Sequence, residues 1–328
     1  MNDLKDLFSS PLAKHFADFV EHKRMCGYKY KNTTLGHLRR LDRFLADNGL
    51  SKPALPQRLV EKWIAKKPHE AYRNQLLRVT SVRMFSLYLI ERRVQAYYPS
   101  KYAVPRGKVN FVPYIFSMEQ ISRLFKEADK ATSRWNTYPH LAGFPVILRL
   151  LYSCGLRVGE ASRLQWRDID LVRSTILIRA SKGDKDRLVV MSRQMRDVLK
   201  EHWDKQKSHY PDSPVFIGCF GGNYSPKSIY HRFREMLFPA GISHGGIGKG
   251  PRLHDLRHTF AVHNLEKWLK AKANMNVNLS ILADYLGHTS LNETQSYLRL
   301  MPSIYPEIIS RMEKSVGKEI RRQQNETN

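Results

Sequence analysis

One stretch of the sequence, between residues 250 and 298, concentrates side chains that can act on a phosphate group. It contains His254-Asp-Leu-Arg257, then Leu-Gly-His288, and nine residues later Tyr297. The guanidinium of Arg257 is a planar set of donors that matches phosphate oxygens. The histidines can donate hydrogen bonds or carry protons near neutral pH, and a tyrosine can be a covalent nucleophile. The spacing predicts that these four residues converge on one phosphate.

The charge balance points to a polyanionic partner. The 328 residues include 55 Lys and Arg against 30 Asp and Glu, a formal net charge of +25. Such an excess repels itself unless a polyanion screens it, so nucleic acid is the leading candidate partner. An anionic membrane surface and a basic protein without such a partner are the alternatives. With 42% hydrophobic and 11% aromatic residues, the chain is not wholly disordered.

The scarcity of long apolar runs and of cysteines indicates the cellular compartment. No apolar run approaches the ~20 residues of a membrane span, and the first residues lack the pattern of a signal peptide. Cys26, Cys154 and Cys219 are scattered without a C-x-x-C pair, which argues against a disulfide framework and a cysteine-based zinc site. We expect a soluble cytoplasmic protein with no membrane association.

The first hundred residues show helical periodicity. Apolar residues recur at 3.6-residue spacing in four segments bounded by Gly, Pro or capping residues, at about 12–27, 32–49, 56–64 and 69–93. The longest is expected to bury Tyr72, Leu76, Val79, Phe85 and Leu89. The helical pattern lapses between residues 97 and 112, so we expect domains at 1–108 and 109–328.

The outer faces of these helices and the linker are basic. A solvated surface explains any single cation, but few acidic residues are interleaved with them, which favours a surface that faces DNA phosphates. The residues predicted to bind DNA are Arg39, Arg40, Arg43, Lys66, Lys67, Arg73, Arg106 and Lys108.

The second domain is predicted to be mostly helical with a small antiparallel sheet. Segments 175–179 and 187–191 have strand-like patterns and flank a polar tip that contains Lys182. Another short strand is expected at 215–217. Helices are expected near 117–125, 139–153, 156–164, 192–205 and 225–238, from residue 254, and around Ile304, Ile308, Ile309 and Met312.

Two familiar site patterns fit poorly. Gly245-Gly-Ile-Gly-Lys249-Gly250 lacks the Ser or Thr that binds magnesium in a phosphate-binding loop. His254 and His258 imitate the zinc-binding pair of a metallopeptidase, but Asp255 replaces the glutamate base and Arg257 would repel the metal. The zinc metallopeptidase remains a weaker alternative.

Five pieces of sequence, in the same order along the chain, resemble motifs of the tyrosine recombinases, the phage integrase-like family. They are Cys154-Gly-Leu-Arg157-Val-Gly-Glu160, Ser181-Lys182-Gly-Asp-Lys-Asp-Arg-Leu-Val-Val190, His254-Asp-Leu-Arg257-His-Thr-Phe-Ala261, Leu286-Gly-His288 and Thr294-Gln-Ser-Tyr297. The resemblance implies a mainly α protein, with an all-α core-binding domain followed by an α+β catalytic domain. The glycine-rich loop before His254 is longer than is usual in the family.

The resemblance also implies a role for each residue. Arg157 and Arg257 would clamp the scissile phosphate, His288 would donate to it, and His254 would orient it or accept a proton from Tyr297. Lys182 would protonate the leaving 5′ oxygen, and Glu160 would hold an arginine in place. Tyr297 would form a 3′-phosphotyrosyl intermediate, without metal, ATP or cofactor.

The family further implies an integrase- or transposase-like recombinase, of the kind carried by mobile elements, that acts at specific sites of double-stranded DNA as a tetramer on synapsed DNA. Integration, excision and resolution all stay open as the outcome. Accessory DNA-bending proteins or sister recombinases are expected partners. A type IB topoisomerase, which relaxes DNA with the same residues, and a DNA-binding relative without activity are the remaining alternatives.

Overall fold

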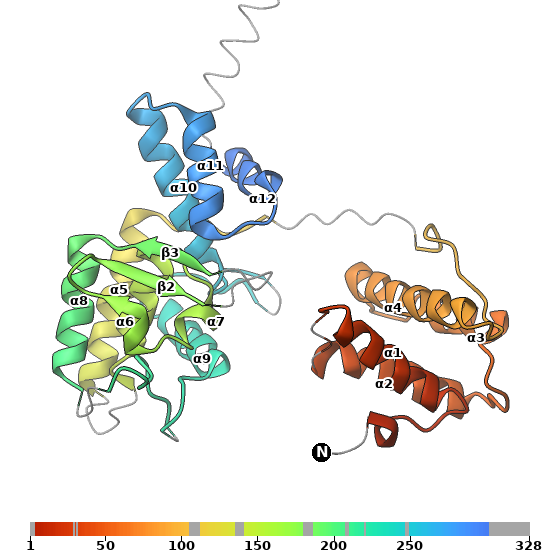
Figure 1. The fold of residues 1–328 in the computed structure, drawn as a ribbon. Helices are drawn as coiled ribbons and strands as arrows, with labels where there is room; N and C mark the ends of the chain where they lie inside the picture. The colour runs from red at the N-terminus through yellow and green to blue at the C-terminus, as the bar shows by residue number, and fades with distance from the viewer. Residues whose placement is uncertain are drawn as a thin grey trace, which may run out of the picture. The chain divides into compact units, whose positions relative to one another are not determined.

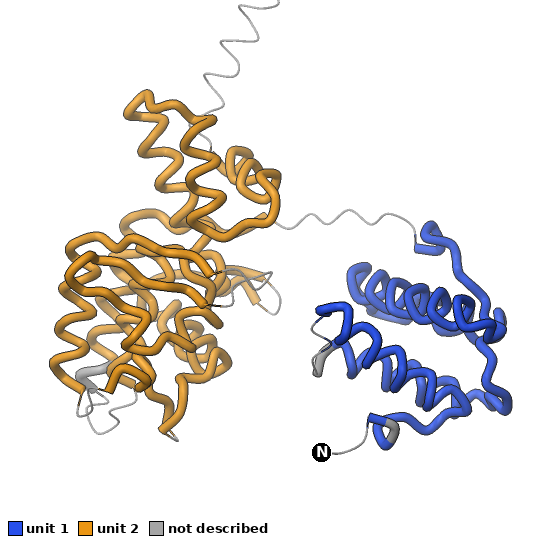
Figure 2. The backbone as a smooth tube through the Cα atoms, in the orientation of Figure 1, with its two compact units in different colours: residues 1–111 blue, residues 112–328 orange. Residues whose placement is uncertain are grey.

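A computed structural model shows that the chain forms two compact units, unit 1 (residues 1–111) and unit 2 (residues 112–328) (Figure 2). It describes residues 4–28, 30, 32–104, 112–134, 141–179, 186–206, 210–219, 221–246 and 249–301. Arg106, Lys108, Lys182 and the helix expected around Ile308 lie outside the described residues.

Unit 1 consists of helices in the residues described (Figure 1). They are η1 (Leu4–Leu7), α1 (Ala13–Met25), α2 (Asn32–Asp47), α3 (Gln57–Ile64) and α4 (Tyr72–Glu91). Their apolar faces share one core, in which the rings of Phe16 and Phe85 stack with 3.9 Å between centroids. The four helical segments expected from the periodicity are all present.

The inward face of α4 differs from expectation at Leu76, which is 37% exposed. Gln75 and Arg78 take the interior positions of this turn. Gln75 donates to the carbonyl of Ile64, and the guanidinium of Arg78 pairs with Glu70. Because these polar groups have buried partners, they displace Leu76 to the outer face. Farther along α4, apolar residues resume the inward face.

Unit 2 is a mostly helical domain with a small sheet. Its helices are α5 (Met118–Arg134), α6 (Phe144–Ser153), α7 (Val158–Ala161), η3 (Trp166–Asp168), α8 (Arg193–Asp204), α9 (Pro226–Leu237), α10 (Asp255–Lys270), α11 (Met275–Leu286), α12 (Leu291–Gln295) and η4 (Ser296–Leu300). Strands β1 (Ile169–Asp170), β2 (Thr175–Ile178) and β3 (Arg187–Val190) form an antiparallel sheet in the order β1-β2-β3. Figure 1 shows α5, α6 and α8 against this sheet, with α10, α11 and α12 grouped together.

The strand expected at residues 215–217 is wrong, and β1 was not anticipated. Residues 214–217 form only isolated bridges, and the Val215 amide donates to the carbonyl of Leu164. The apolar character of this segment serves packing rather than strand pairing: Phe216 is buried and lies so close to Gly143 that a Cβ there would be 2.9 Å from its ring. The two-residue β1 is too short to show a period.

Helix α10 joins the two hydrophobic cores of unit 2. Leu256 belongs to the larger core of α5, α6, α8, α9 and the sheet. Ala261, Val262 and Leu265 belong to a smaller core that also contains Leu286 and Tyr297. The first turn of α10 therefore lies at the junction of both cores, where its polar side chains are firmly positioned.

Candidate active site

Arg257 is anchored in the first turn of α10. Its side chain is fully buried at 1% exposure and donates to the carbonyl oxygens of Gly155 (2.7 Å) and Leu286 (2.6 Å). Burial, followed by the nearby charge of Arg157, lowers the pKa of Arg257 to about 10, so the guanidinium stays charged at neutral pH. His254 lies just before the helix, which begins at Asp255.

Arg157 stands at the start of α7 and is held from two sides. Its Nη1 donates to Glu160 Oε1 (2.8 Å), and its Nη2 donates to the carbonyl of Gly287 (3.1 Å). The backbone before it turns at Gly155, which has a φ of +60°. A Cβ at Gly155 would lie 2.6 Å from the ring of Phe260, so only glycine fits this turn.

Glu160 is buried between two arginines. Arg187, the first residue of β3, donates from Nη1 to Oε1 (2.9 Å) and from Nη2 to Oε2 (2.8 Å) of its carboxylate. Burial alone would raise the pKa of Glu160. Hydrogen bonds from the Arg187 side chain and from the backbone and side chain of Arg157, together with the Arg187 charge, outweigh it and lower this pKa to about 2.

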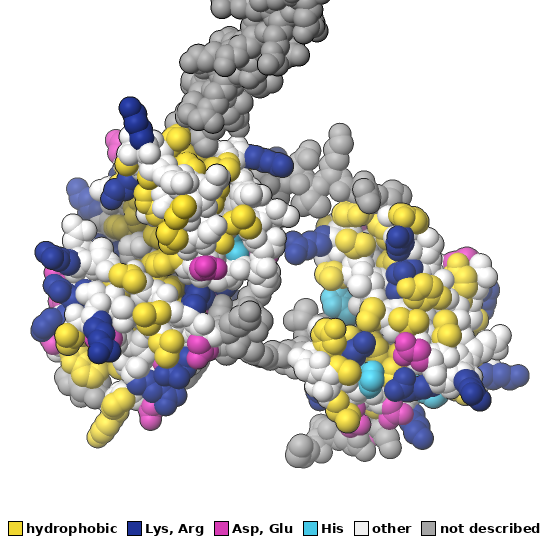
Figure 3. All heavy atoms as spheres, turned by 45° about the horizontal axis from the view of Figure 1, so that its top comes forward, with side chains coloured by type: hydrophobic (Ala, Val, Ile, Leu, Met, Phe, Trp, Pro, Cys, Tyr) yellow, Lys and Arg dark blue, Asp and Glu magenta, His cyan; other side chains and the backbone are white. Residues whose placement is uncertain are grey.

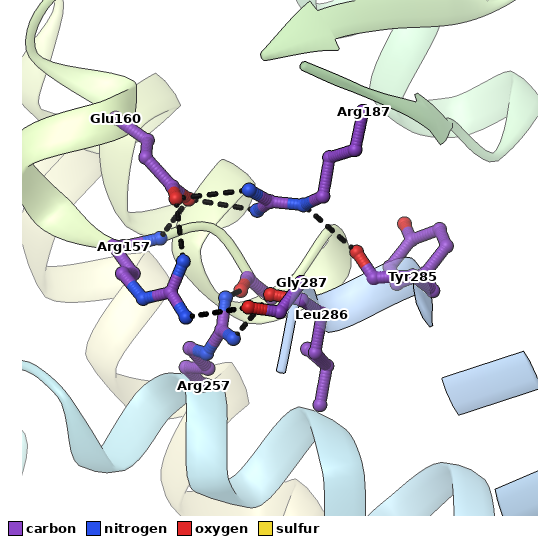
Figure 4. Close-up of polar contacts among 8 residues, drawn as sticks. Arg157, Glu160, Arg187, Arg257, Tyr285, Leu286 and Gly287 are labelled. Carbon is purple, nitrogen blue, oxygen red and sulfur yellow. Dashed lines mark hydrogen bonds and ion pairs between the residues drawn. The ribbon is translucent and has the colours of Figure 1, made fainter. Parts of the chain in front are cut away.

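The C-terminal end of α11 is capped by these three arginines (Figure 4). Arg187 Nε donates to the carbonyl of Tyr285 (3.0 Å), Arg257 to that of Leu286, and Arg157 to that of Gly287. Helix C-termini carry partial negative charge, which complements the guanidiniums. Gly287, with a φ of +66°, ends the helix, and a Cβ there would come within 3.1 Å of the Arg187 side chain.

Tyr297 lies in η4 with its ring in the smaller core, and the residue is 4% exposed. Its hydroxyl lies 3.1 Å from His258 Nδ1. The ring of His288 lies 6.1 Å from the Tyr297 ring, centroid to centroid, and His288 Nδ1 lies 2.7 Å from the hydroxyl of Thr294. His254 stands perpendicular to His258, with 4.7 Å between ring centroids.

The positive charge of the site comes from its arginines rather than from its histidines. Burial, then the charges of neighbouring cationic groups, lowers the pKa of His258 to about 3 and that of His254 to about 4. Burial raises the pKa of Tyr297, although the charges of Arg257 and Arg157 act in the opposite direction. At neutral pH both histidines are therefore neutral and the tyrosine is protonated.

The structure brings together most of the residues expected from the sequence. Arg157, Glu160, Arg257, His254, His288 and Tyr297 gather around the first turn of α10 and the end of α11. Lys182 lies outside the described residues.

Two residues of the site were missed as functional residues. Arg187 shares a strand face with the buried Val189, and a charged residue at a core-facing strand position was a usable signal. His258 had been considered only as a metal ligand, although it lies one helical turn after His254.

The exposed cations of unit 1 gather on neighbouring elements. Arg39, Arg40 and Arg43 project from α2, Lys66 and Lys67 follow α3, and Arg73 lies in the first turn of α4. An open pocket of about 550 Å³ has Arg40, Arg43 and Lys67 in its lining, together with the aromatic rings of Phe44 and Trp63. Figure 3 shows Lys and Arg side chains across the visible face of both units.

Metal ligands and membrane helices were also sought among the described residues. No three His, Cys, Asp or Glu side chains within them are grouped so that they could hold a metal ion. His258 directs Nδ1 at Tyr297 rather than at a shared position with His254. None of the helices in the part of the chain that the structure describes has both the length and the apolar character to cross a membrane.

Comparisons with known proteins agree with this arrangement. The phage integrase family matches residues 115–303. A Sinorhizobium fredii protein named as an integrase/recombinase, y4rB, is 30% identical over 309 residues, which cover 90% of this chain and 95% of the relative. The tyrosine recombinase XerC of Pediococcus pentosaceus is 28% identical over 67% of this chain and 69% of the relative.

Solved structures share the fold. The XerH site-specific recombinase bound to a palindromic difH substrate has a TM-score of 0.63 at 19% identity, covering 86% of this chain and 79% of that one. The Tn1549 transposon integrase in complex with circular intermediate DNA also has a TM-score of 0.63, at 16% identity, covering 88% and 95%.

Proposed function

Since the chain belongs to the phage integrase family of tyrosine recombinases, which are DNA strand-exchange enzymes, we propose that it recombines specific DNA sites by transesterification at Tyr297. The observation that supports this most directly is the position of the Tyr297 hydroxyl, which contacts the side chain of Arg257 and lies within reach of the charge of Arg157. A phosphodiester bound by these arginines would meet its nucleophile and its charge-stabilising groups together.

The two arginines are the proposed phosphate clamp. When a phosphodiester is attacked in line, negative charge gathers on its non-bridging oxygens, and preorganised cations stabilise that charge without reorganising. Each guanidinium has five N–H groups. Arg257 uses two of them on backbone carbonyls, which fix its orientation while leaving donors for phosphate oxygens. His288, steadied by Thr294, would donate to the same phosphate, and His254 would orient it.

The proposed reaction exchanges one ester for another. The Tyr297 oxygen bonds to phosphorus and forms a 3′-phosphotyrosyl link, while the bond to the 5′ oxygen breaks. Lys182, carried over from the family motif, would supply the proton for that leaving oxygen. A 5′ hydroxyl of the same or a partner duplex then reverses the step. Because the number of phosphoester bonds is unchanged, the cycle needs neither ATP nor a metal.

Unit 1 is proposed as the core-binding domain and a second DNA-contacting unit. Its exposed cations on α2, after α3 and at the start of α4 would neutralise phosphates along the duplex. Arg106 and Lys108 would extend this contact through the linker. We further propose a tetramer on synapsed DNA in the cytoplasm, with accessory DNA-bending proteins or sister recombinases. A mobile element as the substrate accords with the fold shared with a transposon integrase.

The other candidate functions are not favoured. A zinc peptidase has no third ligand among the described residues. The family matched is that of the phage integrases, and the relatives reported above are named as recombinases or integrases rather than topoisomerases. A DNA-binding relative without activity would lack part of the catalytic set. Arg157, Arg257, His288 and Tyr297 are all present: both arginines donate to the last residues of α11, and the His288 and Tyr297 rings lie 6.1 Å apart.

A covalent-trapping experiment tests the proposed function. Duplex fragments from the gene's own genomic flanks, nicked so that the cut strand diffuses away, are incubated with the protein in EDTA and then denatured. We expect a protein–DNA adduct that resists denaturation and disappears in Tyr297→Phe. Tight binding without any adduct across the tiled fragments, or an adduct that persists in Tyr297→Phe, would overturn the proposal.

A further inference from the structure

We propose that His258 is a further catalytic residue of this enzyme: it holds the hydroxyl of Tyr297 and accepts its proton as the tyrosine attacks the phosphate. This inference rests on the proposed function, because it assigns the proton acceptor for the same reaction. The sequence had left that role open and had considered His254 for it.

The contact between the two side chains is fixed from both ends. His258 Nδ1 lies 3.1 Å from Tyr297 Oη, which is hydrogen-bonding distance. His258 follows the buried Arg257 on α10, so its backbone belongs to the turn that Arg257 anchors. The Tyr297 ring is held in the smaller core with Leu286 and Met301. Neither side chain needs to move for the proton to pass.

The contacts of His288 and His254 differ from those of His258. His288 Nδ1 lies 2.7 Å from the Thr294 hydroxyl, and its ring centroid is 6.1 Å from that of Tyr297. His254 meets the ring of His258 at a right angle, and the His258–Tyr297 contact is the imidazole–phenol hydrogen bond seen in the site. His258 is thus the imidazole in the position that a general base for Tyr297 requires.

The charges around His258 explain how the base would be controlled. The groups that face it are His254 and Arg257 on its own turn, Arg252 before the helix, and His288 and Tyr297 from the C-terminal segment. In the DNA-free pocket, burial and these neighbours lower the pKa of His258 to about 3, so it is too weak a base to ionise the phenol. A bound phosphodiester would bring a negative charge beside the arginines and raise that pKa. The nucleophile would therefore be activated only when the phosphate is in place.

The step balances without an additional reactant. The O–H bond of Tyr297 breaks and its proton moves to Nδ1 of His258, so the ring must carry its single hydrogen on Nε2 beforehand. The phenolic oxygen bonds to phosphorus as the bond to the 5′ oxygen breaks, and that oxygen takes the proton that Lys182 is proposed to supply. In the return step, the 5′ hydroxyl gives its proton to Lys182 as it attacks phosphorus, and His258 gives its proton back to the departing Tyr297.

Two substitutions separate orientation from proton transfer. In His258→Asn, the amide oxygen can accept a hydrogen bond near the position of Nδ1 but is not basic, and in His258→Phe the ring volume remains without a nitrogen. We expect both variants to cleave the trapped substrate roughly 10²- to 10⁴-fold more slowly in single turnover, with DNA affinity retained. If His258→Asn cleaved within a few-fold of the wild type, the residue would only orient Tyr297, and the proposal would be overturned.

A matched control exists on the same helix. His263 Nδ1 lies 3.0 Å from the hydroxyl of Tyr152, which is a histidine–tyrosine pair of the same kind outside the site. His263→Asn therefore reports what losing such a pair does to folding alone. We expect its cleavage rate to stay within a few-fold of the wild type. A loss as large as that of His258→Asn would show that the effect comes from packing in α10 and would count against the proposal.

A more acidic nucleophile provides a rescue test. If 3,5-difluorotyrosine replaces Tyr297, the phenol has a lower pKa and depends less on a base. We expect this replacement to restore much of the rate in His258→Asn, and the rate of His258→Asn with ordinary tyrosine to rise steadily with pH above neutrality. Absence of rescue together with an unchanged pH profile would mean that His258 does not take the proton.

The hydrogen bond itself can be tested without any DNA. In the full-length protein labelled with ¹⁵N-histidine, we expect the His258 ring to be neutral at pH 7 with its hydrogen on Nε2, and its Nδ1 resonance to shift in Tyr297→Phe. A hydrogen on Nδ1 would refute the proposed acceptor role. If the wild type formed no adduct, this spectrum would still decide the His258–Tyr297 contact, so the two proposals can fail separately.

Discussion

Arg187 and Glu160 form a two-bonded ion pair that ties the first residue of strand β3 to helix α7, with N···O distances of 2.8 and 2.9 Å. The same carboxylate binds Arg157, and Arg187 also donates to the end of α11. The hairpin that carries Lys182, the α7 turn and the α11 terminus are therefore joined through one buried carboxylate and one guanidinium.

Loss of Arg187 is expected to uncouple these segments. Arg187→Ala leaves the buried Glu160 with Arg157 as its remaining partner and removes the donor to the Tyr285 carbonyl. It should therefore lower the free energy of unfolding by about 3 kcal/mol, the low end for a broken buried ion pair. Arg187→Lys keeps the charge but not the fork of donors and should cleave at least about tenfold more slowly with DNA affinity nearly unchanged. Thermal unfolding and single-turnover cleavage measure the two effects. Arg179→Lys, in the Arg179–Asp168 ion pair of the same sheet, is the control, and equal losses in both lysine variants would contradict the expectation.

Glu160 should make the free energy of unfolding of unit 2 fall more steeply as the pH is lowered into the acid range. A carboxyl whose pKa falls on folding stabilises the protein above its unfolded pKa and loses that contribution as pH falls through its folded pKa. For Glu160 the window runs from 4.5 down to about 2, which corresponds to roughly 3 kcal/mol. Urea unfolding across this window should show a steeper fall for the wild type than for Glu160→Gln. The exposed Lys205 also lowers the pKa of Glu201, but solvent screens that pair, so Glu201→Gln should change the slope much less than Glu160→Gln.

The two clamp arginines should differ in how much stability they contribute. Arg257 is fully buried and satisfies two carbonyls, whereas Arg157 is half-buried. Arg257→Ala leaves two acceptors without donors, each of which costs about 1 to 3 kcal/mol, so it should destabilise the protein more than Arg157→Ala. Both variants should slow cleavage at least about 10²-fold. Melting temperatures in the reverse order would mean that the carbonyls of Gly155 and Leu286 find other donors.

Removal of the nucleophilic hydroxyl should hardly change the stability of the fold. Tyr297→Phe keeps the ring in the smaller core and loses the hydroxyl contacts with His258 and Arg257. The free energy of unfolding should change by about 1 kcal/mol or less, and DNA affinity should be retained while the covalent adduct disappears. Equilibrium binding, chemical unfolding and the trapping assay on the same sample separate these outcomes, and a large loss of stability would mean that the hydroxyl anchors η4.

The basic residues of unit 1 should contribute through counterion release. Each phosphate contact adds about one unit to the slope of log K against log salt, so Arg40→Ala and Arg43→Ala should each reduce that slope by about one. Fluorescence anisotropy over a salt series measures the slope. Lys205→Ala, which removes an exposed cation paired with Glu201, is the control. The slope of this control should equal that of the wild type. Unchanged slopes in Arg40→Ala and Arg43→Ala as well would mean that the DNA contact does not lie on α2.

The sequence predicted those parts of the fold that have a strong period. The helices of unit 1 and the β2–β3 hairpin follow from apolar spacing, and the fold class follows from the motif order. Leu76 was misplaced because periodicity counts apolar residues only, whereas Gln75 and Arg78 were buried by finding polar partners. The strand expected at residues 215–217 failed for a related reason: hydrophobic character identifies burial but not the partner of a backbone.

The site, like the fold, has residues that the sequence pattern predicted and residues that only the three-dimensional contacts reveal. Types and spacing predicted that Arg257, His288 and Tyr297 act on one phosphate, and the resemblance to the tyrosine recombinases added Arg157. Arg187 and His258 became recognisable only in three dimensions. Arg187 lies close in sequence to neither Glu160 nor Tyr285, and His258 meets Tyr297 across 39 residues. A charged residue at a core-facing strand position and a second histidine one turn along α10 were the available signals.

The three adjacent carbonyls at the end of α11 affect whether a partly unfolded molecule could cut DNA. They bind arginines from three distant stretches of the chain, and each guanidinium loses one of its fixed acceptors when that helix end is not docked. If part of unit 2 opened, the cations would separate before the tyrosine could reach a phosphate. A half-folded molecule would then be able to bind DNA through its charge but unable to break it.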